Sequence, residues 1–175
     1  EIDPLVAKLA SDPQHFTYLS ECTPGAEIIV GDGRLNLAAQ PEGKYDLMLI
    51  DAFSSSSVPT HLLTREAIDL YLSRMSDEGV LVMHVSNKFM LLPRIVARIT
   101  DDLGAPALYQ YYSPDKSQKV HYSAHASQVV IIARNEEALA AFAAQEEWVD
   151  LKGDGQRPWT DDYTNVVGAM IEKQF

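Results

Sequence analysis

The chain has 175 residues, of which 46% are hydrophobic and 22% are charged, so it is long enough to form one domain around a hydrophobic core. Its formal net charge of −11 argues against nucleic acid or an anionic membrane surface as a partner, because both select clustered Lys and Arg. The single cysteine, Cys22, excludes an internal disulfide and fits a reducing compartment, and no apolar run approaches the ~20 residues of a membrane span. We therefore expect a cytoplasmic location and a small neutral or cationic molecule as partner.

Predicted helices and strands alternate along the chain. Asp3 and Pro4 predict the start of a first helix, as N-cap and first helical residue. Thr64 caps a second predicted helix that ends near Gly79, and Gly104 closes another. Short apolar runs predict strands at 27–31, 46–50, 79–86, 107–113 and 127–134. A further helix is predicted at 135–147, followed by a loop-like tail with a linker near 150–158 and a last short helix.

This alternation, with nearly all-apolar strands, predicts an α/β fold with a mostly parallel sheet and helices on both faces. In such folds ligands bind beyond the carboxyl ends of the strands. Asp32 and Asp51 each follow a predicted strand, so both are expected at that edge. Two interpretations remain open for them. They accept hydrogen bonds from a polar ligand such as an adenine amine or ribose hydroxyls, or they only cap the turns that end the strands.

Several segments in order along the chain carry a family resemblance: "EIDP", "GDGR", "YDLMLIDAFSS..VP.HLLTREA..LYL", "GVLVMHVSN" and "TDDY". Together they resemble the spermidine-synthase-like, aminopropyltransferase-type family, in particular a bacterial branch often fused to an amino-terminal membrane domain. The resemblance implies a Rossmann-like class I methyltransferase fold. It also implies S-adenosylmethionine or its decarboxylated form as cofactor, a small amine as acceptor, and a membrane domain in the parent chain.

The same resemblance assigns cofactor-binding residues. Glu1 would hold the ribose hydroxyls, and Asp32 and Gly33 would border the adenine. Asp51 would face the cofactor and occupy the position of the carboxylate that orients and deprotonates the attacking amine.

Three further positions are considered at the acceptor side. Ser54 stands where aminopropyltransferases commonly carry a second aspartate, and a serine cannot neutralise an ammonium, so spermidine synthesis from a diamine is expected to be poor. Ser56 likewise stands where the fused branch often has an acidic residue. Tyr163, in "WTDDY", would close over the acceptor; the alternative, a docking turn with Asp161 as a helix cap, stays open.

The histidines give weaker signals. His61 and His84 lie near the expected crevice, where an acid–base role competes with the commoner one of a hydrogen-bonded structural histidine. His121 and His125 are four residues apart, but neither a helix start nor a third ligand accompanies them, so no metal site is expected.

The family's first strand and glycine-rich loop have no counterpart here, so the expectation is a single domain, 1–175, truncated at its N-terminus. In the family's order two strands lie between 27–31 and 46–50. Without them, either another polypeptide segment fills the gap, or the two segments pair with each other or with a second copy of the chain. We expect one of the last two, and pairing with a second copy would give a homo-oligomer through exposed strands. The predicted function is transfer from an adenosyl sulfonium donor to a small amine. The alternative is a catalytically silent domain with a binding or regulatory role beside a membrane partner.

Overall fold

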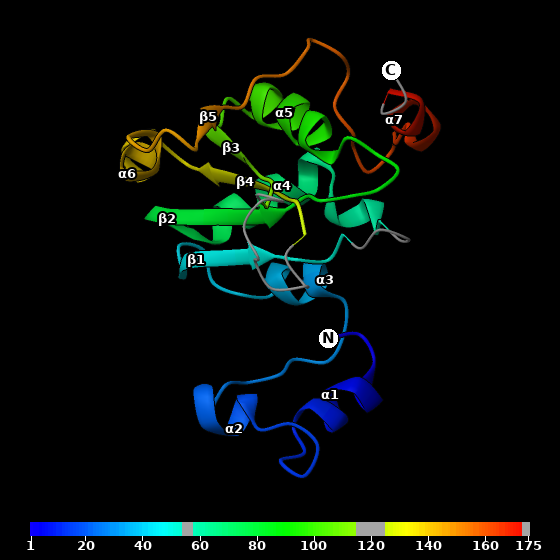
Figure 1. Ribbon diagram of the computed structural model, residues 1–175, viewed down its shortest axis with the longest axis vertical. Helices are drawn as coiled ribbons and strands as arrows, with labels where there is room; N and C mark the ends of the chain where they lie inside the picture. Colours follow the sequence, from blue (N-terminus) through cyan, green and yellow to red (C-terminus); the bar gives the residue numbers. More distant parts are fainter. Residues whose placement is uncertain (54–57, 115–124, 173–175) are drawn as a thin grey trace. The chain divides into compact units, whose positions relative to one another are not determined.

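The computed structural model describes residues 1–53, 58–114 and 125–172. The chain divides into two compact units, Glu1–Gln40 (the N-terminal unit) and Pro41–Phe175 (the sheet unit). Figure 1 labels the helices and strands of both units. No helix within the described ranges is both long and apolar enough to cross a bilayer.

The N-terminal unit contains three short helices, α1 (Pro4–Ala10), α2 (Tyr18–Cys22) and α3 (Gly33–Ala38). As predicted, Asp3 caps α1: its side chain accepts a hydrogen bond from the Leu5 N–H at 2.8 Å. The strand predicted at 27–31 is wrong, because this segment joins no strand ladder among the described residues. Its apolar run fits a strand, but a strand also needs a neighbour along its length. The segment exchanges backbone hydrogen bonds with residue 1, which is too short a partner for a ladder.

The sheet unit is built on five strands in the order β1-β2-β4-β3-β5. Their bounds are β1 (Tyr45–Ile50), β2 (Met75–His84), β3 (Ala107–Tyr112), β4 (Ser127–Ala133) and β5 (Val149–Asp150). β1 and β2 are parallel, whereas the β2–β4, β4–β3 and β3–β5 pairs are antiparallel. The expected α/β class is confirmed, but the pairing is mixed rather than mostly parallel. The physical reason is that β4 returns beside β3 as an antiparallel neighbour, and that the predicted strand at 27–31 adds no parallel pair.

Helices cover both faces of the sheet, as predicted. On one face, α4 (Arg65–Arg74) packs against β2, and α5 (Leu92–Leu103) packs against β4, β3 and α4. The other face carries the short helices η2 (Glu137–Leu139) and α6 (Ala140–Ala143), with η2 lying over β2 and β4. Leu139 of η2 joins a buried apolar cluster with four residues of the sheet: Val80, Leu108, Ile131 and Ala133. η1 (Thr60–Leu62) precedes α4, and α7 (Val166–Glu172) ends the described chain.

The ends of α4 and α5 show which boundaries local sequence determines. Thr64 caps α4 through its hydroxyl, which accepts from the Ala67 N–H at 3.2 Å, and Gly104 ends α5 in a left-handed conformation with φ +64°. α4 ends at Arg74 rather than near Gly79, because the chain enters β2 at Met75 and pairs with β1. A Cβ at Gly79 would lie 2.7 Å from a β1 carbonyl oxygen, so this close approach requires glycine.

The segment predicted as a linker near 150–158 instead packs against the helices. Arg98 of α5 is buried and makes two hydrogen bonds to the Asp154 carboxylate, Nε to Oδ1 at 2.8 Å and Nη2 to Oδ2 at 2.6 Å. Further along, the buried Trp159 accepts at its carbonyl from the Arg65 N–H at 2.8 Å. The tail is therefore part of the sheet unit's packed structure.

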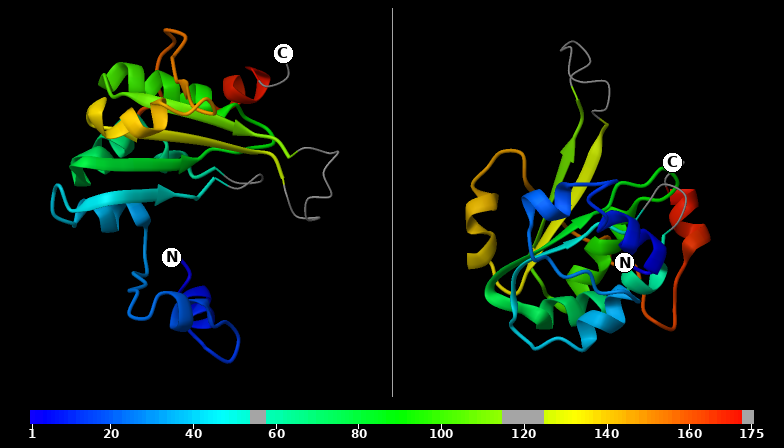
Figure 2. Two further views of the ribbon diagram at one scale, coloured as in Figure 1. Left: turned by 60° about the vertical axis from the view of Figure 1, so that its left-hand side comes forward. Right: turned by 90° about the horizontal axis from the view of Figure 1, so that it is seen from below.

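β1 lies at the edge of the sheet, with β2 as its ladder partner in the described part of the chain (Figure 2). Leu47 and Leu49, which alternate onto one face of β1, are both exposed, whereas Met48 on the other face is buried. An edge strand of this composition can accept another strand. Pairing with a second copy of the chain stays a prediction.

Candidate functional site

Asp51 and His84 meet at the carboxyl ends of the two parallel strands. Ile50 of β1 is in register with Met83 of β2, so the next residues along the two strands are Asp51 and His84. The Nδ1 atom of His84 lies 2.8 Å from Oδ1 of Asp51. The two side chains are 37% and 62% exposed, so the pair is reachable from solvent.

Buried neighbours fix both strand ends in place. Phe53, two residues after Asp51, is buried, and so is Val85, whose N–H donates to the Gln128 carbonyl at 2.9 Å. The apolar run of β1 thus continues into a buried anchor beyond Asp51. This leaves the carboxylate as the polar group that emerges where the strand ends.

The rest of the segment after β2 has structural roles. The Ser86 hydroxyl oxygen accepts from the Gln128 N–H at 2.8 Å. Asn87 is buried, and its Oδ1 accepts from the N–H groups of Phe89 and Met90, both at 2.9 Å. These side chains shape the turn, whereas the His84 ring faces the carboxylate. Sequence reasoning had left His84 between acid–base and structural roles; the signal that singles it out is its register with Asp51 on neighbouring parallel strands.

The predicted cofactor residues Glu1, Asp32 and Gly33 all lie in the N-terminal unit. The Glu1 amino group donates to the Ile29 carbonyl at 3.1 Å, and the Gly31 N–H donates to the Glu1 carbonyl at 2.8 Å. These two bonds flank residue 30 in the manner of one parallel strand pair. They bring Glu1 beside the segment that leads into Asp32.

Both carboxylates already have local partners. Oε1 of Glu1 accepts from the N–H groups of Asp3 and Ile2 at 3.0 and 2.8 Å, and these bonds hold the pKa of Glu1 below its ordinary value. Asp32 caps α3, since its Oδ1 accepts from the Leu35 N–H at 2.9 Å. Gly33 opens α3, and a Cβ there would meet no atom within 4 Å. The capping interpretation of Asp32 is therefore observed, and its role toward adenine stays a prediction.

The "WTDDY" turn docks on the start of α4. The Thr64 hydroxyl donates to Oδ1 of Asp161 at 2.8 Å, and the Asp161 N–H donates to Oε2 of Glu66 at 2.9 Å. The Tyr163 ring lies under the Arg157 guanidinium, with Cζ 4.0 Å from the ring centroid. The docking turn is thus present, with Asp161 supporting the cap of α4, and the role of Tyr163 over an acceptor stays a prediction.

The remaining candidates are the serines after Asp51 and the histidines at 121 and 125. Ser54 and Ser56 lie outside the described residues, as does His121, while His125 is exposed. Within the ranges that the structure covers, no three His, Cys, Asp or Glu side chains are arranged to hold a metal ion.

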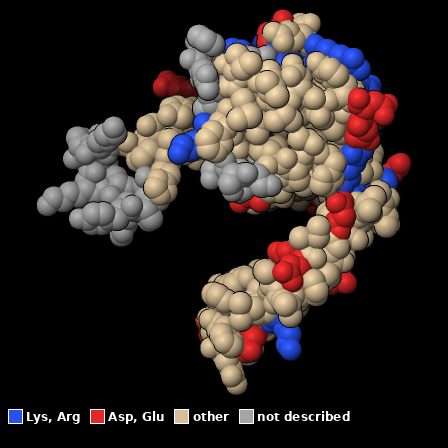
Figure 3. All heavy atoms as spheres, turned by 90° about the vertical axis from the view of Figure 1, so that its right-hand side faces the viewer, with Lys and Arg blue, Asp and Glu red and all other residues tan. Residues whose placement is uncertain are grey.

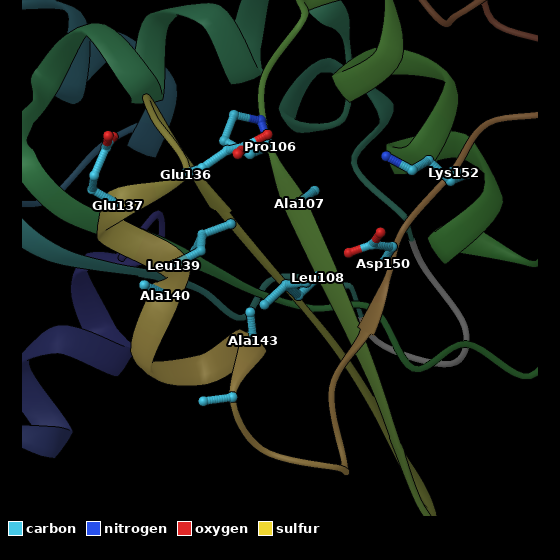
Figure 4. Close-up of a pocket in the computed structure, with 11 residues that line it drawn as sticks. Pro106, Ala107, Leu108, Glu136, Glu137, Leu139, Ala140, Ala143, Asp150 and Lys152 are labelled. Atoms are coloured by element: carbon cyan, nitrogen blue, oxygen red, sulfur yellow. The ribbon is translucent and has the colours of Figure 1, made fainter.

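A groove of the sheet unit lies away from Asp51. It has a volume of about 730 Å³, and Figure 4 shows Leu139 and Ala140 on one side and Asp150 and Lys152 on the other. Its lining includes Ala107, the first residue of β3. Strand β3 runs in the same direction as β2, because both are antiparallel to β4. The groove therefore lies at the amino-terminal end of β3, on the opposite side of the sheet from the carboxyl ends of β1 and β2.

Comparisons with known proteins agree with this fold. No known family profile matches the chain. Over 84 residues, 47% of its length, the chain is 34% identical to a polyamine aminopropyltransferase from Vibrio vulnificus (strain CMCP6), and the match covers 27% of that protein. A probable spermidine synthase from Corynebacterium glutamicum ATCC 13032 matches with a TM-score of 0.60 and 12% identity, over 95% of this chain and 63% of that chain. A spermidine synthase in complex with the transition state analogue AdoDATO matches with a TM-score of 0.58 and 15% identity, over 97% of this chain and 56% of that chain.

These matches confirm the resemblance to spermidine synthases and the Rossmann-like class I methyltransferase fold. The chain spans about a quarter of the curated relative and less than two thirds of either solved chain.

Proposed function

We propose that the chain is a transferase domain that uses an adenosyl sulfonium donor, either S-adenosylmethionine or its decarboxylated form, and a small amine as acceptor. The observation that carries the proposal is the Asp51–His84 pair at the carboxyl ends of β1 and β2, where folds of this class bind their ligands. The 34% identity to a polyamine aminopropyltransferase supports the same class of reaction.

The chemistry suits this pair. Transfer from a sulfonium needs a neutral amine held in line with the donor carbon, and a group that takes the proton released from the nitrogen. A carboxylate beside an imidazole supplies an acceptor for the amine's N–H groups and a destination for that proton. Asp51 is the residue that would orient the amine.

On the donor side, Glu1 and Asp32 are the residues that would hold the adenosyl group. An ionised carboxylate offers about four lone-pair positions and so can accept more than one hydrogen bond. Carboxylates therefore suit ribose hydroxyls and an adenine amine, which donate hydrogen bonds.

The test is transfer by the purified protein from each of the two donors to a panel of monoamines, diamines and polyamines, with products identified by mass spectrometry. We expect an alkylated amine together with the demethylated or dealkylated thioether from one donor. We also expect little spermidine from putrescine, because Ser54 cannot neutralise the second ammonium of a diamine. If a folded protein transfers nothing from either donor, the silent-domain alternative is favoured instead. A robust spermidine peak would contradict the prediction for Ser54.

Adenosyl binding is tested separately by calorimetry with S-adenosylmethionine. Asp32→Asn keeps a good N-cap for α3 while removing the charge, and we expect it to weaken binding about tenfold, as for one charge-assisted hydrogen bond. Asp3→Asn is the matched control, since Asp3 caps α1 in the same unit and has no predicted ligand role. Equal affinity in the Asp32 variant would remove this residue from the site.

A further inference from the structure

The hydrogen bond between Asp51 and His84 determines where the imidazole carries its proton. An ionised carboxylate can only accept hydrogen bonds, so at 2.8 Å the Nδ1 atom of His84 must be the donor. In a neutral imidazole with a proton on Nδ1, the lone pair is on Nε2. The pair therefore fixes the tautomer that leaves Nε2 as a base.

The surroundings leave this base available. Among the described residues, neither side chain has another hydrogen bond or ion pair, and the His84 side chain is 37% exposed. Ser86 and Asn87, the next polar residues along the chain, are engaged with backbone N–H groups. The imidazole is thus held on one nitrogen and open on the other.

We propose that His84 is the general base of the transfer reaction and that Asp51 is its positioning residue, which orients the amine through the imidazole; this inference rests on the function proposed above. The amine nitrogen forms a bond to the donor carbon while the carbon–sulfur bond breaks and its electron pair goes to sulfur, giving a neutral thioether. The proton leaves the nitrogen for Nε2 of His84. The resulting imidazolium is stabilised by the Asp51 carboxylate and returns the proton to solvent.

Ordinary basicities favour the imidazole over the carboxylate. A free imidazole has a pKa of about 6.5 and a free aspartate about 3.9, and a general base works best when its pKa lies near the operating pH. The imidazole therefore takes up a proton far more readily at neutral pH than a carboxylate does.

The key variant is His84→Gln, because a glutamine amide can still donate a hydrogen bond to Asp51 but cannot take up a proton. We expect it to lower kcat about 100-fold or more while leaving KM for the amine and donor affinity within about threefold. His15→Gln is the matched control: His15 forms a similar pair with Asp12, Nδ1 to Oδ2 at 3.3 Å, on the surface of the N-terminal unit. Its kcat should equal that of the wild type.

A second readout does not depend on turnover. Nitrogen NMR of the labelled protein should show His84 with a protonated Nδ1, and Asp51→Asn should abolish this preference. A His84→Gln protein that keeps kcat within about threefold overturns the inference while the proposed function stands, and so does a wild-type His84 protonated on Nε2 alone. If the wild-type protein transfers nothing from either donor, the proposed function fails and this inference fails with it.

Discussion

The two units of the chain differ in how they bury apolar side chains. In the sheet unit, strands and helices bury many large apolar side chains, among them Ile131, Leu81 and Ile99. In the N-terminal unit the only buried hydrophobic residue is Ala7, within the part that the structure describes, and large apolar side chains are exposed on all three helices. In Figure 3 the visible surface of this unit is mainly uncharged, with scattered carboxylates.

This difference also distinguishes the predicted ligand-binding residues of one unit from those of the other. Asp51 and His84 are mounted on the ends of strands in a packed sheet. Glu1, Asp32 and Gly33 are held by local hydrogen bonds and short helices. We therefore expect the acceptor-side pair to be preorganised, and the donor-side residues to depend on whatever covers the apolar surface of their unit.

The largest difference in stability is expected between a substitution in the core of the sheet unit and one on the surface of the N-terminal unit. Ile131→Ala removes a side chain that is 1% exposed in β4, and we expect it to lower the free energy of unfolding by about 3 kcal/mol. Leu35→Ala, at a position that is 72% exposed in α3, should change it by less than about 0.5 kcal/mol. Urea unfolding measures both, and equal losses would show that the N-terminal unit has a covered core.

An intermediate effect is expected where the tail crosses α5. Asp154→Ala leaves the buried Arg98 guanidinium without its bidentate partner, and we expect a loss of about 2 kcal/mol, less than for a fully buried ion pair because Asp154 is partly exposed. An unchanged stability in urea unfolding would mean that the tail does not hold α5.

The same pair predicts a pH dependence. The Arg98 guanidinium lowers the pKa of Asp154 to about 2, from an ordinary value of 3.8. Because the folded-state pKa lies below the unfolded one, the carboxylate stabilises the fold fully above about pH 5, and this contribution is lost as the pH falls toward 2. Asp154→Asn should flatten this part of the stability profile, and an unaltered slope would assign the acid sensitivity to other carboxyl groups.

The smallest difference in stability is expected between substitutions of the helix N-caps in the two units. Thr64→Ala removes both the cap of α4 and its bond to Asp161, and should cost about 1–2 kcal/mol in global unfolding. Asp3→Ala removes the equivalent cap of α1. It should change the free energy of the main unfolding transition by less than about 0.5 kcal/mol, because α1 is hardly packed. Hydrogen exchange of α1 and α4 would compare the local stability of the two helices directly. A loss of global stability for Asp3→Ala as large as that for Thr64→Ala would contradict the prediction.

The structural features that the sequence predicts correctly depend on residues only a few positions apart in the chain. The caps at Asp3 and Thr64 and the glycine end of α5 each follow from one or two local residues, and all three are observed. The apolar strand that stops at Asp51 is likewise readable, because its run is short and uniform.

What the sequence does not predict depends on partners far along the chain. The run at 27–31 reads as a strand, yet strand formation needs a neighbouring ladder that no local pattern supplies. Arg98 and Asp154 are 56 residues apart, and Asp51 and His84 are 33 apart. The Asp51–His84 pair follows from the register of β1 and β2, and the Arg98–Asp154 pair follows from the docking of the tail on α5. Neither pairing can be predicted without the order of the strands and the path of the tail.

One measurement tests the proposed transferase site most directly: kcat of Asp51→Asn against wild type, with the donor and amine that give transfer in the product assay. Asparagine is nearly isosteric with aspartate but carries no charge, so it can neither stabilise an imidazolium at His84 nor hold an amine as a carboxylate does. We expect kcat to fall about 100-fold or more, with the free energy of unfolding unchanged within about 0.5 kcal/mol, since Asp51 is exposed. A variant that is folded and retains kcat within about threefold would contradict the assignment of this strand end as the reacting site.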